Sequence, residues 1–421
     1  MATEPEKHID WATEDVLDPV SGQNNVVEPP ESKKETGWSR FETPPRQWVN
    51  WLARFVDRWN KWNEAKSEPK TLTGETTNDV PADGSGHTHE IETATQSQAE
   101  SGTGDQLMNV TRTRQLTDTI VSSLAVRNWT TRQSASDSTW DDVVWSSELE
   151  LYVAVALSGT DQIMTSTNGV DWTARSAPAV EQWTSIEWSP ELELFVSGNS
   201  TSSDVMTSTD GETWTLRSIP ELTNAFSIKW VPELGLFVAV GAGDPITSPD
   251  GINWTARTPS ESDTWRGIEW SPDLELIVAV GGTSGDVIMT SPDGINWTSR
   301  TSPGIGNNLS DVVWSSERGL FVAVGGSSTE ILTSPDGINW SARTIPDVSV
   351  QAVEWSPGFN TFVSVGGPSS LIYSLDGTNW TSAELEFGGW GAVIWNPNRR
   401  EFLSVGQGGT GTDQVMTSLS F

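Results

Sequence analysis

The sequence predicts an all-β fold, a seven-bladed β-propeller whose ring is closed by strand exchange. Three observations predict it: two sets of tryptophans that each recur seven times, four short strand patterns in each repeat, and a last repeat that is completed by residues upstream of the first. The predicted propeller covers 127–421. A short helical N-terminal attachment segment over 1–66, with its helix over 46–65, and a fibrous linker and neck over 67–126 precede it.

Tryptophan marks the repeat. The first set lies in the pattern W-S-P-E-L-x-L-F-V-A-V and comprises Trp145, Trp188, Trp230, Trp270, Trp314, Trp355 and Trp395. The second set follows the pattern S-P-D-G-I-N and comprises Trp129, Trp172, Trp214, Trp254, Trp297, Trp340 and Trp380. Members of a set are 40 to 44 residues apart, and repeats of that length are typical of propellers and solenoids.

Each repeat contains four short strand patterns. In the unit that begins at Arg266, the predicted strands are 267–270, 274–280, 286–291 and 296–300. Valine, isoleucine and aromatic residues fill these segments, whereas proline, aspartate and glycine fill the turns between them. Four antiparallel strands in every repeat, arranged radially, form the blade of a propeller.

The phase of the repeat predicts how the ring closes. The chain ends at Met416–Phe421, after the third strand of the last unit, and the missing fourth strand is found upstream at Arg127–Arg132. The first and last strands would then share one blade. Such sharing removes the open sheet edge that an unclosed array would expose.

The turn S-x-D-G-x-x-W resembles the Asp-box of sialidase-like propellers, although it is one residue shorter. Ser208-Thr209-Asp210-Gly211 is one copy, and the first copy has Asn168 in place of the aspartate. The remaining copies contain Asp250, Asp293, Asp336 and Asp376. We interpret the turn as a folding device: aspartate accepts hydrogen bonds from its own turn, glycine adopts a positive φ and tryptophan packs between blades.

Arginine also repeats, three residues after the second-set tryptophan. The six copies are Arg132, Arg175, Arg217, Arg257, Arg300 and Arg343, and Ala383 occupies the seventh place. A sialidase would need three arginines that converge on one carboxylate. Equivalent positions around a ring do not converge, so we expect these arginines to pair with acidic neighbours on adjacent blades. Tyr152 and Tyr373 are the only tyrosines, which also disfavours a tyrosine nucleophile with an acidic partner.

The segments that vary between repeats indicate where a ligand binds. They join strand four to the next strand one and strand two to strand three, and both kinds lie on one face of a blade; we call it the variable face. The opposite, uniform face carries the W-S-P-E and P-D-G turns. Four more tryptophans lie five residues before members of the first set, near the predicted channel mouth: Trp140, Trp183, Trp265 and Trp390. They either stack on receptor sugars or pack the mouth, and Ala225, Leu309 and Val350 interrupt the set.

Composition excludes several classes of protein. The 57 acidic and 24 basic side chains give a net charge of −33, the opposite of a nucleic-acid-binding surface. Excess acid with little lysine resembles proteins adapted to high salt, although an acidic mesophilic protein has the same balance. The sequence has no cysteine, no signal-peptide pattern and no apolar run as long as a membrane helix. We therefore expect synthesis in the host cytoplasm and no membrane insertion.

The N-terminal segment carries a further resemblance. Lys34–Trp38 and Glu42–Leu52 resemble the N-terminal region of tailed-phage fibre and baseplate-attached proteins, with a G-W, E-x-P-P and N-W pattern before a helix. The resemblance implies that this segment attaches to a virion tail or baseplate protein, with its pattern residues at Trp38, Pro44, Pro45, Trp48 and Trp51. The apolar spacing after Pro45 is that of a coiled-coil seam, so the helix packs against copies of itself, another protein or its own chain.

Two of the three histidines lie in one motif of the polar linker. Gly86-His87-Thr88-His89 would place both imidazoles on one face of a strand. The motif resembles the H-x-H site of trimeric phage fibres, in which three chains share one metal ion. The resemblance implies a homotrimer with a structural Fe, Zn or Ni ion at His87 and His89. Two polar residues of a flexible linker are the alternative.

Three hypotheses about function follow. The first is a virion tail fibre whose propeller binds a host-surface protein or glycan, without enzymatic activity, on a salt-loving host. The second is a glycoside hydrolase of surface polysaccharide, which needs two carboxylates at one site, about 5–10 Å apart. The third is a cellular propeller scaffold, similar to the assembly factors of photosynthetic membranes. The first hypothesis alone accounts for the N-terminal pattern and the H-x-H motif together.

Overall fold

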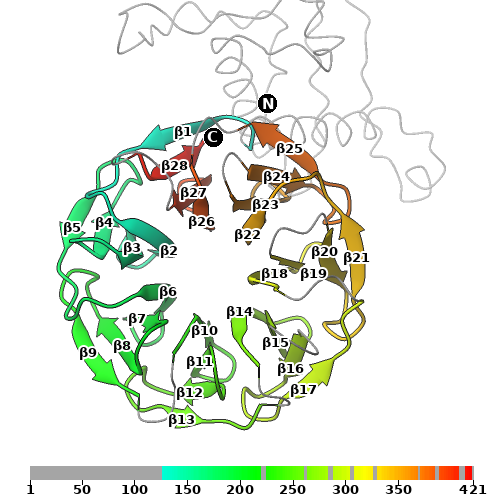
Figure 1. The fold of residues 1–421 in the computed structure, drawn as a ribbon, viewed down its shortest axis with the longest axis horizontal. Coiled ribbons are helices and arrows are strands. Elements are labelled where there is room, and N and C mark those ends of the chain that lie inside the picture. The colour runs from blue at the N-terminus through cyan, green and yellow to red at the C-terminus, as the bar shows by residue number, and fades with distance from the viewer. Residues whose placement is uncertain are drawn as a thin grey trace, which may run out of the picture. The chain divides into compact units, whose positions relative to one another are not determined.

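The computed structural model describes residues 126–219, 224–259, 263–282, 288–303, 308–325, 330–367, 370–384, 388–406 and 413–419. These residues form 28 strands and no helix, in seven antiparallel four-stranded sheets arranged around a central axis (Figure 1). The predicted all-β, seven-bladed propeller is confirmed. The predicted N-terminal helix over 46–65 and the linker and neck up to residue 125 lie outside the described residues.

The blades are numbered in chain order, and strand one of each is innermost. Blades 1 to 3 comprise β2 (Thr139–Ser146), β3 (Leu151–Ser158), β4 (Ile163–Ser166) and β5 (Thr173–Arg175); β6 (Trp183–Ser189), β7 (Leu194–Asn199), β8 (Asp204–Ser208) and β9 (Thr215–Ser218); and β10 (Ser227–Val231), β11 (Leu236–Val240), β12 (Ile246–Ser248) and β13 (Thr255–Ala256). Blades 4 to 6 comprise β14 (Trp265–Ser271), β15 (Leu276–Gly281), β16 (Ile288–Ser291) and β17 (Thr298–Arg300); β18 (Asp311–Ser315), β19 (Leu320–Val324), β20 (Glu330–Ser334) and β21 (Ser341–Thr344); and β22 (Val350–Ser356), β23 (Thr361–Gly366), β24 (Ser370–Ser374) and β25 (Thr381–Glu384). Blade 7 comprises β26 (Trp390–Asn396), β27 (Glu401–Gly406), β28 (Val415–Ser418) and β1 (Trp129–Arg132).

Ring closure follows the predicted exchange. The N-terminal strand β1 pairs antiparallel with β28, so that Trp129 lies opposite Ser418 and Arg132 opposite Val415. The backbone N–H of Leu419 donates to the carbonyl of Asn128 at 3.1 Å, just beyond the last strand pair. The first described strand and the last one therefore complete a single sheet, in which β1 pairs the outer side of β28 as strand four does in the other blades.

The core lies between the blades. The middle strands, such as β3 and β23, are buried on both faces because each blade packs between two neighbours. One apolar cluster joins Val153 and Val155 of blade 1 to Trp183, Ile186 and Trp188 of blade 2, and equivalent clusters recur around the ring. This burial of apolar surface between blades explains why the strands consist of near-continuous apolar runs.

The Asp-box-like turns behave as predicted. In blade 2, Oδ1 of Asp210 accepts the backbone N–H groups of Glu212 and Thr213 at 2.8 and 2.7 Å. Gly211 has a φ of 71°, and a Cβ there would lie 2.9 Å from Leu151 of blade 1. Partial burial opposes ionisation of the aspartates, but donated N–H groups outweigh it and lower the pKa of Asp250, Asp293 and Asp336 to about 2.

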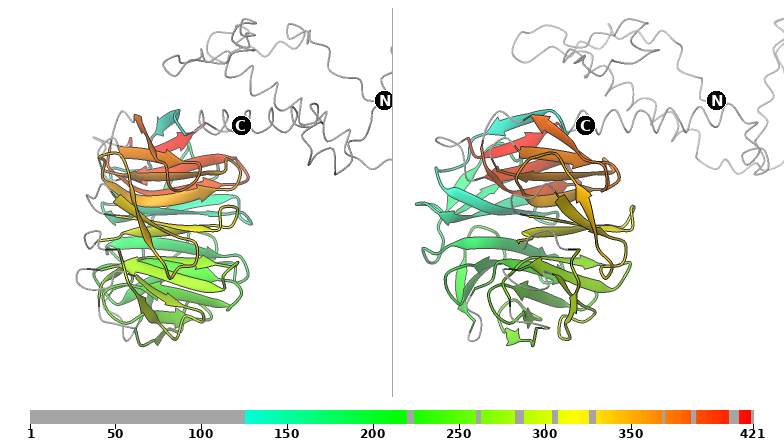
Figure 2. Two further views of the ribbon diagram at one scale, coloured as in Figure 1. Left: turned by 90° about the vertical axis from the view of Figure 1, so that its right-hand side faces the viewer. Right: turned by 45° about the vertical axis from the view of Figure 1, so that its right-hand side comes forward.

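A hydrogen bond to the W-S-P-E turn links successive blades. The indole Nε1 of Trp188 in blade 2 donates to Oε2 of Glu148 in blade 1 at 2.8 Å. The same bond joins blades 2 and 3, 4 and 5, and 5 and 6, through Trp230–Glu191, Trp314–Asp273 and Trp355–Glu317. The acidic residue of the motif therefore has a structural role that its sequence pattern did not reveal. Edge-on, the strands run between the two faces of the ring, with these turns on the uniform face (Figure 2).

Candidate functional site

The inner strands place charged side chains in the central channel. The position immediately before the first-set tryptophan carries, in blade order, Val144, Glu187, Lys229, Glu269, Val313, Glu354 and Ile394. Two residues earlier, blades 1 and 5 carry Asp142 and Asp311. These six charged residues line a cavity of about 790 Å³, and its wall extends to Ser147, Pro357 and Pro397 in turns of the uniform face.

Lys229 is the one cation among these six groups. Its Nζ lies 2.9 Å from Oε2 of Glu269, and the side chains remain 30% and 15% exposed, so water reaches the pair. Burial by itself would lower the pKa of Lys229, but the carboxylates of Glu269 and Glu187 outweigh that effect and raise it. Lys229 therefore stays charged and is shared by carboxylates from blades on both sides.

The other channel carboxyl groups hold their protons more strongly than usual. Burial raises the pKa of Glu187 to about 7 and that of Glu354 to about 8, although Lys229 opposes the shift. Burial also raises the pKa of Asp311 to about 7, and that of Asp142 well above its usual value, against the N–H groups that they accept. Near neutral pH these carboxyl groups are therefore partly protonated, and the channel carries less negative charge than its number of carboxyl groups suggests.

The two channel aspartates also join neighbouring blades. Oδ2 of Asp142 accepts the backbone N–H of Ile186 in blade 2, and Oδ2 of Asp311 accepts that of Val353 in blade 6, both at 2.8 Å. Their Oδ1 atoms accept the N–H of Val143 and Val312 at 2.8 Å. These carboxyl groups therefore join the inner strands of neighbouring blades by hydrogen bonds, in addition to lining the channel.

The four tryptophans of the predicted receptor site are buried. Trp140, Trp183 and Trp265 have no exposed surface, and Trp390 is 2% exposed. In each of these blades a bulge follows the tryptophan. Trp140, Trp183 and Trp265 each lie in the same inter-blade cluster as the apolar residue three positions later. Protein atoms cover their rings in this structure, and a part for them in receptor binding stays a prediction.

The repeated arginines have a different partner from the one expected. Each Nε donates to a threonine Oγ1 on strand three of its own blade, as Arg300 does to Thr290 at 2.9 Å. The equivalent bonds are Arg132–Thr417, Arg175–Thr165, Arg217–Thr207, Arg257–Thr247 and Arg343–Thr333. Among the described residues, only Arg175 also forms an ion pair with an adjacent blade, at Glu212. The prediction of inter-blade acidic partners is correct for Arg175 and wrong for the other five, whose Nε atoms, in the part of the chain that the structure describes, bond only the threonine of their own blade. The six guanidinium groups lie on the outermost strands and do not converge.

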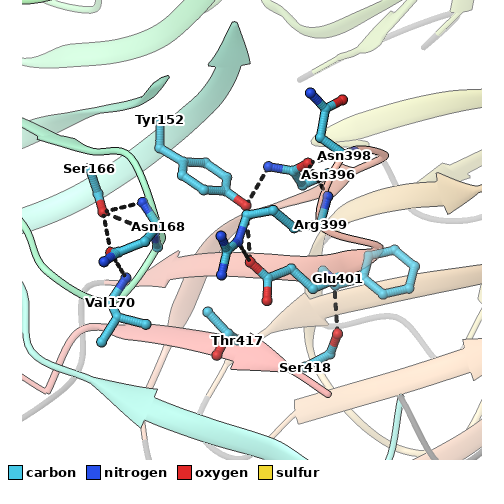
Figure 3. Close-up of polar contacts among 12 residues, drawn as sticks. Tyr152, Ser166, Asn168, Val170, Asn396, Asn398, Arg399, Glu401, Thr417 and Ser418 are labelled. Atoms are coloured by element: carbon cyan, nitrogen blue, oxygen red, sulfur yellow. Dashed lines mark hydrogen bonds and ion pairs between the residues drawn. The ribbon is translucent and has the colours of Figure 1, made fainter. Parts of the chain in front are cut away.

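A second polar cluster lies where blade 7 meets blade 1 (Figure 3). Tyr152 stands where most other blades have phenylalanine, and its hydroxyl accepts Nδ2 of Asn396 at 2.6 Å and donates to Oε1 of Glu401 at 3.3 Å. Nε of Arg399 donates to the same carboxylate oxygen at 2.6 Å. A tyrosine beside a glutamate is the pair that the sequence disfavoured, and the structure places both side chains in the seam.

The electrostatics of this pair are those of a structural contact. Tyr152 has no exposed surface, and Glu401 is 4% exposed. Burial raises the pKa of Tyr152, and the charge of Glu401 raises it further, so the phenol stays protonated. A nucleophile requires access to substrate and activation by a base or a lowered pKa. Tyr152 has no access to substrate in this structure, and its pKa is raised.

The metal and attachment predictions fall on residues that are not described. His87 and His89, and Trp38, Pro44, Pro45, Trp48 and Trp51, all precede residue 126. Within the described ranges, no group of three or more histidine, aspartate, glutamate or cysteine side chains is arranged to hold a metal ion. No helix in the same ranges is long and apolar enough to cross a membrane. These predictions stay open.

Comparison with known proteins supports the fold alone. No protein-family model matches the chain, and no curated protein matches it in sequence. Among solved structures, virginiamycin B lyase from Staphylococcus aureus is similar, with a TM-score of 0.60 and 8% identity over 69% of this chain and all of the lyase. YCF48 bound to a D1 peptide is also similar, with a TM-score of 0.55 and 16% sequence identity over 70% of this chain and 97% of YCF48. The Swd1 propeller of Myceliophteria thermophila has a TM-score of 0.51 and 13% sequence identity over 69% of this chain and all of the Swd1 propeller. At these identities only the propeller architecture is shared.

Sequence reasoning missed the channel charges, although a signal for them was present. Aligning the repeats on the first-set tryptophan places glutamate at the preceding position in three blades and lysine in one. A charge at a fixed position of an apolar strand indicates a shared polar environment. The Tyr152 cluster gave a weaker signal, because its members come from blades at opposite ends of the array.

Proposed function

We propose that this chain is the receptor-binding protein of a virus tail fibre, attached to the virion by its N-terminal segment and bound to a host-surface protein or glycan through the propeller. The N-terminal resemblance and the H-x-H motif motivate the proposal. It places the protein in the tail of the virion, with a salt-loving host. Multivalent display would allow weak individual contacts to hold a particle.

The contact between Trp129 and Val126, where the chain enters the ring, supports the proposal. The indole Nε1 of Trp129 donates to the carbonyl of Val126 at 2.9 Å, the same contact that Trp214 makes with Gly211 inside an Asp-box-like turn. The segment that leads into β1 therefore occupies the place of a uniform-face turn. A propeller tethered at that face presents its variable loops on the opposite face, toward a receptor.

We propose no enzymatic activity for the propeller. The hydrolase alternative requires an accessible pair of carboxyl groups, one protonated and one ionised. The channel carboxyl groups interact with one lysine and with backbone N–H groups, and Tyr152 is buried and protonated. Incubation of the protein with labelled host envelope tests this point, and release of soluble label would contradict it.

Cell binding by two matched variants tests which face binds. Val180, on the loop between β5 and β6 of the variable face, is 85% exposed, and Ile295, in a turn of the uniform face, is 41% exposed. We expect Val180→Arg to weaken the binding of labelled full-length protein to cells of a salt-loving host by about tenfold, or about 1.4 kcal/mol. Ile295→Arg introduces the same charge on the other face and should leave binding unchanged.

Either of two results would contradict the proposed function. Loss of binding in Ile295→Arg but not in Val180→Arg would place the receptor on the uniform face. Absence of binding to every cell type in a panel of salt-loving archaea and bacteria would remove the adhesin hypothesis.

The assembly state is a separate part of the proposal. We propose a homotrimer in which His87 and His89 of three chains share one Fe, Zn or Ni ion. Light scattering in high salt, combined with metal analysis, should give the mass of a trimer and about one metal per three chains. His87→Ala with His89→Ala should remove the metal. A metal-free monomer would contradict this part and leave the receptor-binding part to the cell assay.

A further inference from the structure

The arginine–threonine bond is missing from blade 6, and both of its residues are changed there. Six blades pair an arginine on strand four with a threonine on strand three. In blade 6 the arginine position holds Ala383, and the threonine position holds Tyr373. Register confirms the equivalence, because Tyr373 lies opposite Thr381 as Thr290 lies opposite Thr298.

A seventh arginine reaches this place from another part of the chain. Nε of Arg127 donates to the hydroxyl of Tyr373 at 2.8 Å, its NH2 group donates to the same oxygen, and the guanidinium lies over the ring, 5.5 Å from the centroid. Arg127 lies 246 residues before Tyr373, in the segment that leads into β1. Tyr373 is 6% exposed, so its position is fixed by blade 6. Arg127 therefore links the ring-closing segment to the neighbouring blade.

The closing strand needs such a link more than any other strand. In the other six blades, strand four follows strand three through a turn of the backbone, whereas β1 meets β28 only through hydrogen bonds and side chains. β1 has four residues, of which Thr130 and Thr131 are exposed and Trp129 and Arg132 are only partly buried. Short edge strands open more readily than the core strands they pair with.

We infer that Arg127 and Tyr373 form a clamp that holds β1 in the ring and passes tension from the N-terminal segment to blade 6. Tension applied from upstream reaches Val126 and Arg127 before it reaches the first strand pair at Trp129. The clamp delivers that tension to Tyr373, inside the continuous sheet of blade 6. The role under tension rests on the proposed function, in which the protein is held by its N-terminus, whereas the role in ring closure does not.

Hydrogen exchange of the full-length protein tests the closure role. We expect Arg127→Ala and Tyr373→Phe each to accelerate exchange of the β1 amides by about tenfold, which corresponds to about 1.4 kcal/mol. The double variant should exchange no faster than the single ones, because both substitutions remove one interaction. Arg300→Ala is the matched control, since it removes an arginine–threonine bond that lies wholly within blade 4 and should accelerate exchange only there.

Three results would overturn the clamp. Unchanged hydrogen exchange of the β1 amides in both single variants would show that the contact does not stabilise the pairing of β1 with β28. Additive effects in the double variant would show that the two residues act separately. Equal acceleration in all blades would show a general loss of stability. Tyr373→Phe keeps the buried ring and removes only the hydroxyl, so at least one variant retains the packing of blade 6.

The role under tension has its own measurement. When single molecules are held at their two termini and stretched, the ring should first open at a lower force in Arg127→Ala than in the natural sequence or in Arg300→Ala. Equal forces would overturn the transfer of tension. Failure of cell binding would affect the proposed function but neither of these measurements, so the two ideas fail independently.

Discussion

Two kinds of seam hold the ring together. Between blades 5 and 6, as in three other seams, an indole of one blade donates to a carboxylate in an exposed turn of the preceding blade. Between blades 7 and 1, no such bond is formed by Trp145, and the buried cluster of Tyr152, Asn396, Arg399 and Glu401 takes its place. These four seams have an apolar interior and a hydrogen bond to an exposed turn, whereas the closing seam combines an apolar cluster with a buried polar one.

The difference follows from connectivity. Blades 5 and 6 are joined by a short segment of chain, so chain connectivity already selects the correct neighbour. Blade 7 is joined to blade 1 only through its fourth strand, β1, whereas its other three strands come from the far end of the chain. Tyr152 and Asn396 are 244 residues apart, and closing so long a loop costs more entropy. A purely apolar face would pack against any blade of the array. A buried polar network is stable only against its complementary partner, so it favours the correct closure over alternatives.

Replacing Tyr152 by phenylalanine, the residue at this position in most other blades, tests the contrast between the seams. We expect it to have the largest effect on the free energy of unfolding. Tyr152→Phe leaves the buried Nδ2 of Asn396 without its acceptor and Glu401 without one donor. An unsatisfied buried polar group costs about 1–3 kcal/mol, so we expect the free energy of unfolding to fall by about 2–3 kcal/mol. Urea unfolding followed by tryptophan fluorescence measures the change.

The reciprocal substitution is the matched control. Phe321 occupies the same position in blade 5, where its neighbours across the seam are apolar. Phe321→Tyr places a hydroxyl there without a partner and should also destabilise, by about 1–3 kcal/mol. If Tyr152→Phe is neutral or stabilising, the closing cluster does not contribute as argued, and the two seams are equivalent.

The ring could be predicted because its features repeat in every blade. Contacts that depend on the folded sheet, or that occur in one blade only, could not be predicted in this way. Blade number, strand order and the exchange of β1 follow from the spacing of tryptophans, because every repeat has to bury the same faces. The Asp-box-like turn was also predictable, since its hydrogen bonds are local. The partner of the repeated arginines was not, because threonine at strand three is close only after the sheet has formed.

The same limit applies to the candidate site. Trp140 and its counterparts lie at the beginning of the inner strands, but they are buried beside a bulge, and sequence does not reveal on which side of a bulge a side chain lies. The channel charges follow a fixed position, so they were accessible to alignment of the repeats. Contacts such as Arg127 with Tyr373 join residues at opposite ends of the array, and a single sequence gives no sign of the pairing.

The channel carboxyl groups predict that the stability of the protein depends on pH, and blade 7 contributes none of them. On its inner strand blade 7 contributes only uncharged side chains such as Ala392 and Ile394 to the cavity, and Arg400 lines it from the turn that follows, so all the channel carboxyl groups come from the other blades. Burial raises the pKa of Glu354 to about 8, above its value in the unfolded chain, so its stabilising contribution is complete at low pH and is lost as pH rises through 8. Glu354→Gln removes this loss. We expect the variant to match the natural protein at pH 4 and to exceed it by about 1–2 kcal/mol at pH 9.

Unfolding in urea at fixed salt over this pH range makes the comparison. Glu233→Gln, in an exposed turn of the uniform face, serves as the control and should show the same difference from the natural protein at every pH. A Glu354→Gln variant whose advantage is constant between pH 4 and pH 9 would contradict a titrating channel group. A variant that loses stability at pH 9 would show that attraction to Lys229 outweighs burial.

The indole–carboxylate latch has the smallest expected effect and offers the closest control. Glu317 accepts Nε1 of Trp355 at 2.7 Å, whereas Glu233, at the equivalent place in blade 3, does not accept Nε1 of Trp270. The turns differ because Val231 replaces the serine that caps the others, and Leu234 donates instead to the carbonyl of Val231 at 3.2 Å. Glu317→Ala should cost about 1 kcal/mol, and Glu233→Ala close to nothing, in the free energy of unfolding. Equal costs would mean that the exposed carboxylates act through general surface charge, and the repeated seams would then depend on apolar packing alone.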